Sequence, residues 1–321
     1  LNQYVEAMNA QARVRIRVNR EILGRALQGL TISEEMFGRV GPAVNSGKAI
    51  FMYGPPGNGK TTIAQSVGHM ILGSPMYIPY AVDVDGQVVR VFDNVNHEVL
   101  PDQSENGRTS TGERRDARWV RIRRPVIMVG GELTLETLDL VYDPINKYYE
   151  APFQMKANGG MFLIDDFGRQ QVRPRDLLNR WIVPLESRVD FLTLSNGRKI
   201  EIPFNVLIVF STNMPPADLV DEAFLRRIPH KIEVGDPTYD QFREIFRRVC
   251  EQKRVPYDEQ ALAYLLQEWY LKQDRNLRAV HPRDIIEQIL DISRYLGEPP
   301  RLTKEMLDRA ASAYFVDLDV Y

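Results

Sequence analysis

The chain has 321 residues, of which 44% are hydrophobic and 26% charged, and its formal net charge is −2. This composition is typical of a globular protein with room for two domains, and it argues against a disordered chain or a basic binder of polyanions. The sequence holds no apolar run of the ~20 residues that a membrane-spanning helix needs. Its single cysteine, Cys250, excludes an internal disulfide and suits a reducing, cytoplasmic compartment, with the thiol expected to be buried.

The first 30 residues are predicted to form an amphipathic helix followed by a connector. Apolar side chains recur at helical spacing from Val5 to Leu23, with arginines between them. A second helix is expected to begin at Ser33, which suits a helix cap. The chain starts at Leu1, inside the first predicted helix, so there is room for a preceding segment in the full protein.

A phosphate-binding motif occupies the next stretch. An apolar run at 50–53 is typical of a buried parallel strand, and apolar residues at helical spacing predict a helix over 62–72. Between them, all fixed positions of the pattern G-x-x-x-x-G-K-[ST] are matched. The loop and its continuation are Gly54, Pro55, Pro56, Gly57, Asn58, Gly59, Lys60, Thr61 and Thr62.

Strand, loop and helix in this order form a site for the phosphates of a nucleotide. Glycines let successive N–H groups surround phosphate oxygens, and the helix start adds the positive end of its dipole. Lys60 is expected to reach the β- and γ-phosphates, and the Thr61 hydroxyl to bind Mg²⁺. The preceding connector then has two open interpretations: it covers the adenine, or it packs as scaffold.

Residues 75–124 have an unusual composition and are predicted to be an insertion. Alternating residues around Asp85-Gly86 indicate a hairpin at 82–91, and a polar, turn-rich stretch follows at 101–112. The insertion is either a basic arm that faces nucleic acid or nucleotide, or a solvated or subunit-facing segment. The observation behind the first interpretation is a group of arginines: Arg108, Arg114, Arg115, Arg118, Arg121, Arg123 and Arg124.

An acidic motif follows a predicted strand at 125–130 and a short helix near 134–140. Between this helix and the acidic motif, the stretch 142–150 is predicted to be an aromatic loop or helix, which either grips a polypeptide or simply packs. The apolar run 161–164 ends in Asp165 and Asp166, as at the end of a central strand beside a phosphate loop. Asp165 is expected to hold Mg²⁺ through water, and Asp166 to orient or deprotonate the attacking water.

The next stretch is predicted to complete the sheet. A helix is expected at 173–181, a hairpin at 189–202 with Asn196-Gly197 at its turn, and a buried strand at 205–211. A polar residue after this strand, in the run Ser211-Thr212-Asn213, is expected to hydrogen-bond the nucleophilic water. A helix at 219–228 and a short strand at 232–234 end the layer.

From residue 238 onward only helical patterns occur, at 239–253, 258–273, 282–296 and 303–314. We therefore predict an α/β fold with a three-layer P-loop parallel sheet over 31–236, followed by a small all-helical lid domain over 237–321. Residues 1–30 are assigned to an N-terminal helix and connector. The insertion at 75–124 and the hairpin at 189–202 belong to the α/β domain.

Taken in order, these motifs resemble the functional elements of AAA+ ATPases over roughly residues 20–314. The hairpin at 189–202 looks like the pre-sensor-1 hairpin of one AAA+ branch, and segments 185–188, 203–204 and 211–215 are most similar to MoxR-type ATPases. Segment 158–160 also resembles enhancer-binding transcription activators of that branch. Residues 54–61 correspond to the Walker A element, Asp165-Asp166 to Walker B and 211–213 to sensor 1. Residues 224–227 correspond to the arginine-finger element and Arg283 to sensor 2.

The resemblance implies a homo-oligomeric ring, usually of six subunits, with ATP and Mg²⁺ bound between neighbours. By position, Asn213 would sense the γ-phosphate, and Arg226 or Arg227 would enter the site of the next subunit. Arg283 on the lid would touch phosphate in its own site. Arginine suits these roles because its planar charge pairs with phosphate oxygens through two parallel hydrogen bonds.

One departure from the family affects the expected chemistry. The family usually has Glu where this chain has Asp166, so the carboxylate is one methylene shorter. Our first hypothesis is a cytoplasmic Mg²⁺-dependent ATPase that remodels a protein partner, as a MoxR-like chaperone would. Two alternatives stay open: a nucleic-acid-associated motor that uses the arginine-rich insertion, and a nucleotide-gated scaffold that hydrolyses ATP slowly.

Overall fold

The computed structural model describes residues 1–12, 17–71, 75–101, 116–219 and 222–315. The chain divides into two compact units. The first comprises Leu1–Gln28, Glu34–Tyr53 and Thr61–Glu233. The second comprises Gly29–Ser33, Gly54–Lys60 and Val234–Tyr321, so the phosphate loop groups with the C-terminal helices.

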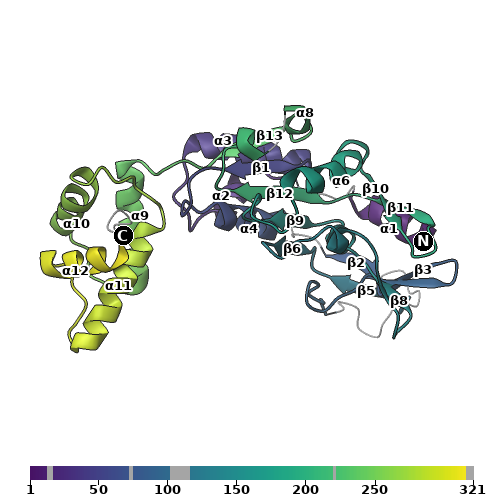
Figure 1. Ribbon diagram of the computed structural model, residues 1–321. Coiled ribbons are helices and arrows are strands. Elements are labelled where there is room, and N and C mark those ends of the chain that lie inside the picture. The colour runs from purple at the N-terminus through teal and green to yellow at the C-terminus, as the bar shows by residue number, and fades with distance from the viewer. Residues whose placement is uncertain (13–16, 72–74, 102–115, 220–221, 316–321) are drawn as a thin grey trace. The chain divides into compact units, whose positions relative to one another are not determined.

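A five-stranded parallel sheet forms the centre of the first unit (Figure 1). Parallel strands are buried on both faces, which explains why these strands read as continuous apolar runs. The sheet confirms the predicted α/β fold class. In sheet order the strands are β13 (His230–Glu233), β1 (Ile50–Tyr53), β12 (Leu207–Thr212), β9 (Met161–Ile164) and β6 (Val126–Val129).

Helices cover both faces of this sheet. On one face, α4 (Lys60–Ile71) approaches so closely that a Cβ at Gly68 would lie 2.6 Å from the Met161 side chain. On the other face, α6 (Pro174–Ser187) buries Trp181 against Phe162 and Phe210, with ring centroids 5.7 and 6.2 Å away. This helix is longer than the predicted 173–181, because its apolar face continues along the sheet.

Replacing Trp181 by alanine is expected to lower the free energy of unfolding by about 3–5 kcal/mol, because the variant loses a fully buried indole between two strands. Trp181→Phe should cost less, about 1–2 kcal/mol, since the indole N–H has no acceptor among the described residues. Urea denaturation followed by far-UV circular dichroism measures both changes. An alanine variant as stable as the parent would contradict this packing.

The insertion at 75–124 forms two small sheets together with residues 141–150, and from here on we use the name insertion for both segments. The strands β2 (Met76–Pro79) and β5 (Trp119–Ile122) pair antiparallel. The second sheet has the order β3 (Ala81–Val84), β4 (Gln87–Arg90), β8 (Tyr148–Glu150) and β7 (Val141–Asp143). The predicted hairpin at 82–91 is confirmed, and both turn residues, Asp85 and Gly86, have the positive φ that such a tight turn requires.

The prediction of an aromatic loop or helix at 142–150 is wrong. This stretch forms the antiparallel β7–β8 hairpin, because Tyr142 pairs with Tyr149 across the strands at 4.9 Å between ring centroids. Tyr149 is buried in the hydrophobic core of the insertion, and β8 adds in parallel to β4. Tyr149 therefore packs in the protein core, which is the second of the two interpretations of this stretch.

The other elements of the first unit differ from the predictions in number, type or bounds, except for one hairpin. The N-terminal stretch holds two helices, α1 (Asn2–Ala12) and α2 (Arg20–Ala26), and α3 (Glu34–Ser46) follows. The hairpin at 189–202 is confirmed as β10 (Val189–Thr193) and β11 (Lys199–Pro203). The short helix near 134–140 is a 3-10 turn, Glu136–Leu138, and α5 (Phe153–Lys156) precedes β9. The single helix expected at 219–228 is instead α7 (Pro216–Leu219) and α8 (Glu222–Leu225), with 220–221 outside the described residues.

The second unit is helical, as predicted (Figure 1). Its helices are α9 (Tyr239–Lys253), α10 (Glu259–Leu265), α11 (His281–Leu296) and α12 (Lys304–Tyr314), and α10 continues as a π-helical stretch, Leu266–Leu271. Thr238 caps α9 through a reciprocal capping box with Gln241. Cys250 is buried in this core, and burial raises its pKa to about 12, so the thiol is unreactive as expected. Across the described residues, none of the helices combines the length and apolarity of a membrane span.

Candidate functional site

The phosphate loop, residues Gly54–Lys60, closes around its own lysine. The Lys60 ammonium is only 6% exposed and donates hydrogen bonds to the carbonyl oxygens of Gly54 and Pro55, at 2.9 and 2.8 Å. A Cβ at Gly54 would lie 2.3 Å from the Val234 carbonyl oxygen, and its φ is +136°, so only glycine fits there. The backbone thus requires glycine at position 54, in agreement with the glycine pattern of the motif.

Asn58 anchors this loop to the residues just before α11. Its amide donates to Asp236 at 2.7 Å, and its side-chain oxygen accepts from the Ala279 N–H at 3.0 Å. The Val280 N–H adds a bond to the Gly57 carbonyl at 2.9 Å, and Arg278 forms an ion pair with Asp236. Asp236 and Arg278 have no signal in the sequence, because no spacing rule links them to a loop so far away in the chain.

Arg283 lies in the first turn of α11. Its guanidinium pairs with Asp284 at 2.8 Å, and the other Asp284 oxygen accepts from the Tyr314 hydroxyl at 2.9 Å. The predicted lid arginine is therefore held on its own helix by a carboxylate that the sequence analysis did not single out.

In the first unit, a hydroxyl and a carboxylate meet at the carboxyl edge of the central sheet. The Thr61 hydroxyl lies 3.0 and 2.9 Å from the two oxygens of Asp165. Thr61 stands in the first turn of α4, beside the exposed Thr62, and Asp165 directly follows β9. These are oxygen ligands of the type that Mg²⁺ prefers, usually one or two from the protein with phosphates completing the shell, so the residues present fit this ion.

A second pair lies beside the first. The Asn213 side-chain amide donates to an Asp166 carboxylate oxygen at 3.0 Å. Strand β12 is fixed to the loop that carries Asp166: the Phe167 N–H donates to the Ser211 carbonyl, and the Thr212 hydroxyl donates to the Phe167 carbonyl, both at 2.7 Å. The structure thus brings together the two residues that the sequence assigned to the attacking water.

Asp166 has a backbone φ of +49°, in the left-handed region that residues other than glycine rarely adopt. Gln170 stabilises this conformation. Its amide donates to the Asp165 and Asp166 carbonyls at 2.9 and 3.1 Å, and its side-chain oxygen accepts from the Gly168 N–H at 2.8 Å. In the sequence, the one signal that could have indicated Gln170 is its position four residues after the second acid.

The two arginines proposed to act in the next subunit lie at the end of α8. Arg226 is 75% exposed in its side chain and pairs with Glu222 at 2.9 Å. Arg227 pairs with Glu186 of α6 at 2.6 Å. Both carry their charge on the surface of the first unit, where glutamates hold them.

The arginines of the insertion have partners inside the protein. Arg118 pairs with Asp116, Arg123 pairs with Glu98, and Arg121 donates to the Pro101 carbonyl. Arg124 is buried and donates to the Gly159 carbonyl at 2.8 Å. Arg108, Arg114 and Arg115 lie outside the described residues. The described arginines therefore favour a structural role over a nucleic-acid arm.

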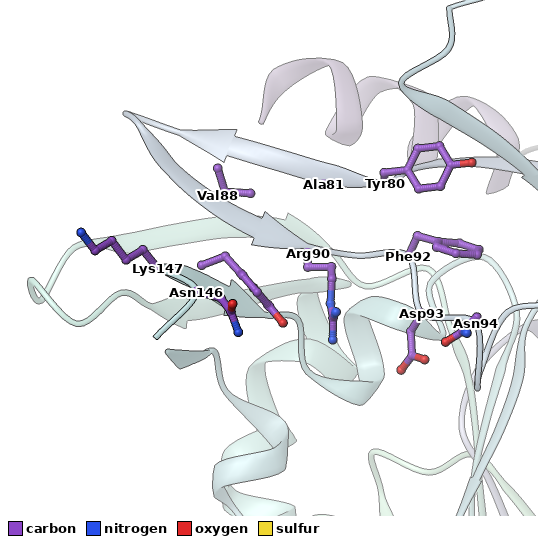
Figure 2. A pocket seen from close by; sticks show the side chains of 10 residues that line it. Tyr80, Ala81, Val88, Arg90, Phe92, Asp93, Asn94, Asn146 and Lys147 are labelled. Carbon is purple, nitrogen blue, oxygen red and sulfur yellow. The ribbon is translucent and has the colours of Figure 1, made fainter. Parts of the chain in front are cut away.

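Two hollows in the first unit lie outside this cluster of acids. One, of about 340 Å³, lies between α2 and α3, and includes Leu23 and Phe37 in its walls. The connector there is fixed by Asn45, whose side chain bonds the Val18 backbone twice at 2.8 Å. The other, of about 530 Å³, lies on the insertion (Figure 2).

Comparisons with known proteins agree with the fold. Two crystal structures of NtrX from Brucella abortus match, each with a TM-score of 0.51. The ADP complex is 14% identical and the match covers 88% of this chain and 56% of that chain. The ATP complex is 15% identical and the match covers 89% of this chain and 56% of that chain. A RuvB variant from Thermotoga maritima matches with a TM-score of 0.51 at 12% identity, over 89% of this chain and 71% of that chain. At these identities the likeness shows a shared AAA+ fold. The chain spans 56% of those NtrX chains.

Comparison by sequence matches a smaller part of the chain. Residues 238–313 match a family described as a domain of unknown function (DUF8689). This match covers less than half of the chain and lies within the helical unit. Among curated protein sequences no match is found.

Proposed function

We propose that this chain is a Mg²⁺-dependent AAA+ ATPase that assembles into a ring and remodels a protein partner, as a MoxR-like chaperone would. The observation that carries the proposal is the arrangement of Thr61 against Asp165, with the Asp166–Asn213 pair beside it. Together they supply an ion-binding pair and a water-binding pair at one sheet edge. Phosphoryl transfer needs both, since its catalysis consists mostly of positioning and charge stabilisation.

In this proposal the phosphate loop, Gly54 to Thr62, binds ATP through its N–H groups, and Lys60 exchanges its carbonyl partners for phosphate oxygens. Thr61 and Asp165 hold Mg²⁺, which supplies charge neutralisation to the phosphates. Asp166 accepts the proton of the attacking water, and Asn213 fixes the orientation of that carboxylate. Arg283 adds positive charge from the helical unit.

The ring is proposed because two arginines, Arg226 and Arg227, stand together on the surface of the first unit at a helix end. An arginine supplied to the site from another subunit is worth about 10³–10⁵ in rate in comparable enzymes. A nucleic-acid motor is the weaker alternative, because each described arginine after residue 115 in the insertion contacts a protein partner. Slow hydrolysis is a further alternative that the shorter Asp166 side chain motivates.

A mixing experiment tests the shared site. The Lys60→Ala variant lacks the phosphate lysine, and the Arg226→Ala/Arg227→Ala variant lacks the cations proposed to act in the neighbouring subunit. Each alone should be inactive, whereas a one-to-one mixture should regain turnover at roughly a quarter of its interfaces, where both functional halves meet. If the mixture stays inactive although differently tagged subunits co-purify in one ring, the arginines do not act across subunits.

Gln170→Glu is expected to lower kcat for ATP by about tenfold or more while KM changes little, because the new carboxylate repels the two carbonyls that Gln170 now binds and displaces Asp166. The matched control is Gln171→Glu, the same change at an exposed neighbouring position. Steady-state phosphate release measures both. Equal kcat values for the two variants would contradict the positioning role of Gln170.

A further inference from the structure

Two turns of the insertion are built in the same way. Residues 93–97 and 143–147 both read Asp-x-(Val/Ile)-Asn-x, and we call them the twin turns. In the first, Asp93 accepts from the Val95 N–H and from the Asn96 amide, both at 2.8 Å. In the second, Asp143 accepts from the Ile145 N–H at 2.9 Å and from the Asn146 amide at 2.8 Å.

The backbone of the twin turns matches as well. The carbonyl of the leading aspartate accepts from the N–H four residues later, at 2.8 Å in both turns. Each turn thus fixes the backbone of its aliphatic residue, and both Val95 and Ile145 are 87% exposed. An aliphatic side chain exposed to this extent adds no stability to the isolated chain. On a fixed backbone it loses little conformational entropy when a partner covers it.

The hollow of about 530 Å³ lies between the twin turns (Figure 2). Its walls include Asn94, next to Val95, and Asn146, next to Ile145. Alternate residues of β4 and its extension, Val88, Arg90 and Phe92, line it, while Val89 and Val91 between them face the core. Two aromatic rings add to the walls: Tyr80, which packs edge-on to Phe92, and Tyr148, over which the Arg90 guanidinium lies at 4.9 Å.

The charges around this surface cancel one another. Arg90 pairs with Glu150 at 2.7 Å, and the buried Lys156 ammonium pairs with Asp93 at 2.8 Å and also with Glu150. Burial raises the pKa of Asp93, but hydrogen bonds from Lys156, the Val95 N–H and Asn96 outweigh it and hold the pKa at about 2, so this carboxylate is charged at neutral pH. Lys147 and Asp143 complete three cations and three carboxylates.

This balance selects the class of partner. A phosphate backbone or an anionic membrane binds where cations exceed carboxylates, and this surface has no such excess. Aromatic and aliphatic walls around a neutral polar network instead match an uncharged protein segment, since aromatic residues and arginine dominate such contacts.

We propose that the twin turns and the hollow between them form a docking surface for an uncharged segment of a partner protein that carries aliphatic or aromatic side chains. The inference rests on the proposed function in that it names the surface that receives the remodelled partner. The insertion then supplies the recruiting element of this chain.

The test uses peptides selected on the full chain. A phage-displayed library of random dodecapeptides is selected against the parent protein, and the consensus peptide is synthesised with a fluorescent label. Anisotropy then compares the parent with the turn variant Val95→Ser/Ile145→Ser, which keeps both aspartates and asparagines. The matched control is Leu271→Ser/Tyr295→Ser, which removes apolar side chains that are 62% and 89% exposed on the helical unit.

We expect selected peptides rich in aliphatic and aromatic residues and poor in charge, with binding about tenfold weaker to the turn variant and unchanged for the control variant. The proposal is overturned if turn variant and parent bind equally, if the consensus is charged, or if no consensus emerges. Displacement of the peptide by an oligothymidylate of about 16 nucleotides, the upper length of a typical single-strand site, would overturn it as well. ATP turnover on the same preparations separates the two claims. A parent that binds peptide without hydrolysing ATP contradicts the proposed function alone, and active protein that ignores the turns contradicts the docking surface alone.

Discussion

Lys60→Ala is expected to reduce kcat/KM for ATP by about 100- to 1,000-fold. The ammonium is buried within the phosphate loop, where it can exchange its bonds to two loop carbonyls for bonds to the transferred phosphoryl group. Removing it takes away one pre-positioned cation from the transition state. Steady-state phosphate release with saturating Mg²⁺ measures the effect, and nucleotide affinity is followed separately with a fluorescent ATP analogue.

Lys48→Ala provides the matched control, because Lys48 is exposed just before β1 and its replacement removes the same charge from the same stretch of chain. This variant should behave like the parent protein. If Lys60→Ala hydrolyses ATP as fast as Lys48→Ala, the phosphate loop does not serve catalysis and the proposed ATPase mechanism is wrong.

Asp166→Asn is expected to lower kcat by about 10²–10⁴, the usual contribution of a general base. Asparagine keeps the size of the side chain and can still bond Asn213, which now lies 3.0 Å from the carboxylate, but it accepts no proton from water. ATP binding should persist, since the phosphate loop is unchanged. Single-turnover kinetics with Mg²⁺·ATP separates the loss of chemistry from any loss of binding.

Asp166→Glu distinguishes a base from a structural acid. Glutamate retains the carboxylate and is the usual residue in the AAA+ ATPases that the sequence resembles, so activity within about tenfold of the parent is expected. If Asp166→Asn is as active as the parent, the protein is a nucleotide-gated scaffold whose hydrolysis does not depend on this residue. If both variants are inactive yet still bind ATP, the short side chain and its left-handed backbone are required together.

The central sheet and its site could be predicted from the sequence because the information is local. Each strand is an apolar run, and the acids and Asn213 stand directly after β9 and β12, so parallel strands bring them to one edge. The spacing of the glycines in the phosphate loop likewise indicates its backbone conformation. Lys60 and Asp165 can therefore be located without knowledge of any long-range contact.

Other features depend on contacts between distant segments and could not be predicted. The β7–β8 hairpin was missed because a Tyr-rich stretch suits several structures, and its pairing with β4 is set by a segment far away in the chain. The bond from Asn58 to Asp236 spans 178 positions. The left-handed φ of Asp166 has no sequence signature, and the three bonds of Gln170 that hold it follow only from the folded loop.

The ion pairs of Lys156 connect the insertion mechanically to the central sheet. Its ammonium, 6% exposed between Asp93 and Glu150, joins the strands of the insertion to the end of α5. The chain runs from α5 through residues 157–160 straight into β9, at whose far end stand the two acids. If the proposed function holds, tension on a partner segment bound to the insertion would be transmitted through one cluster of ion pairs and a few covalent bonds to the strand that carries both acids.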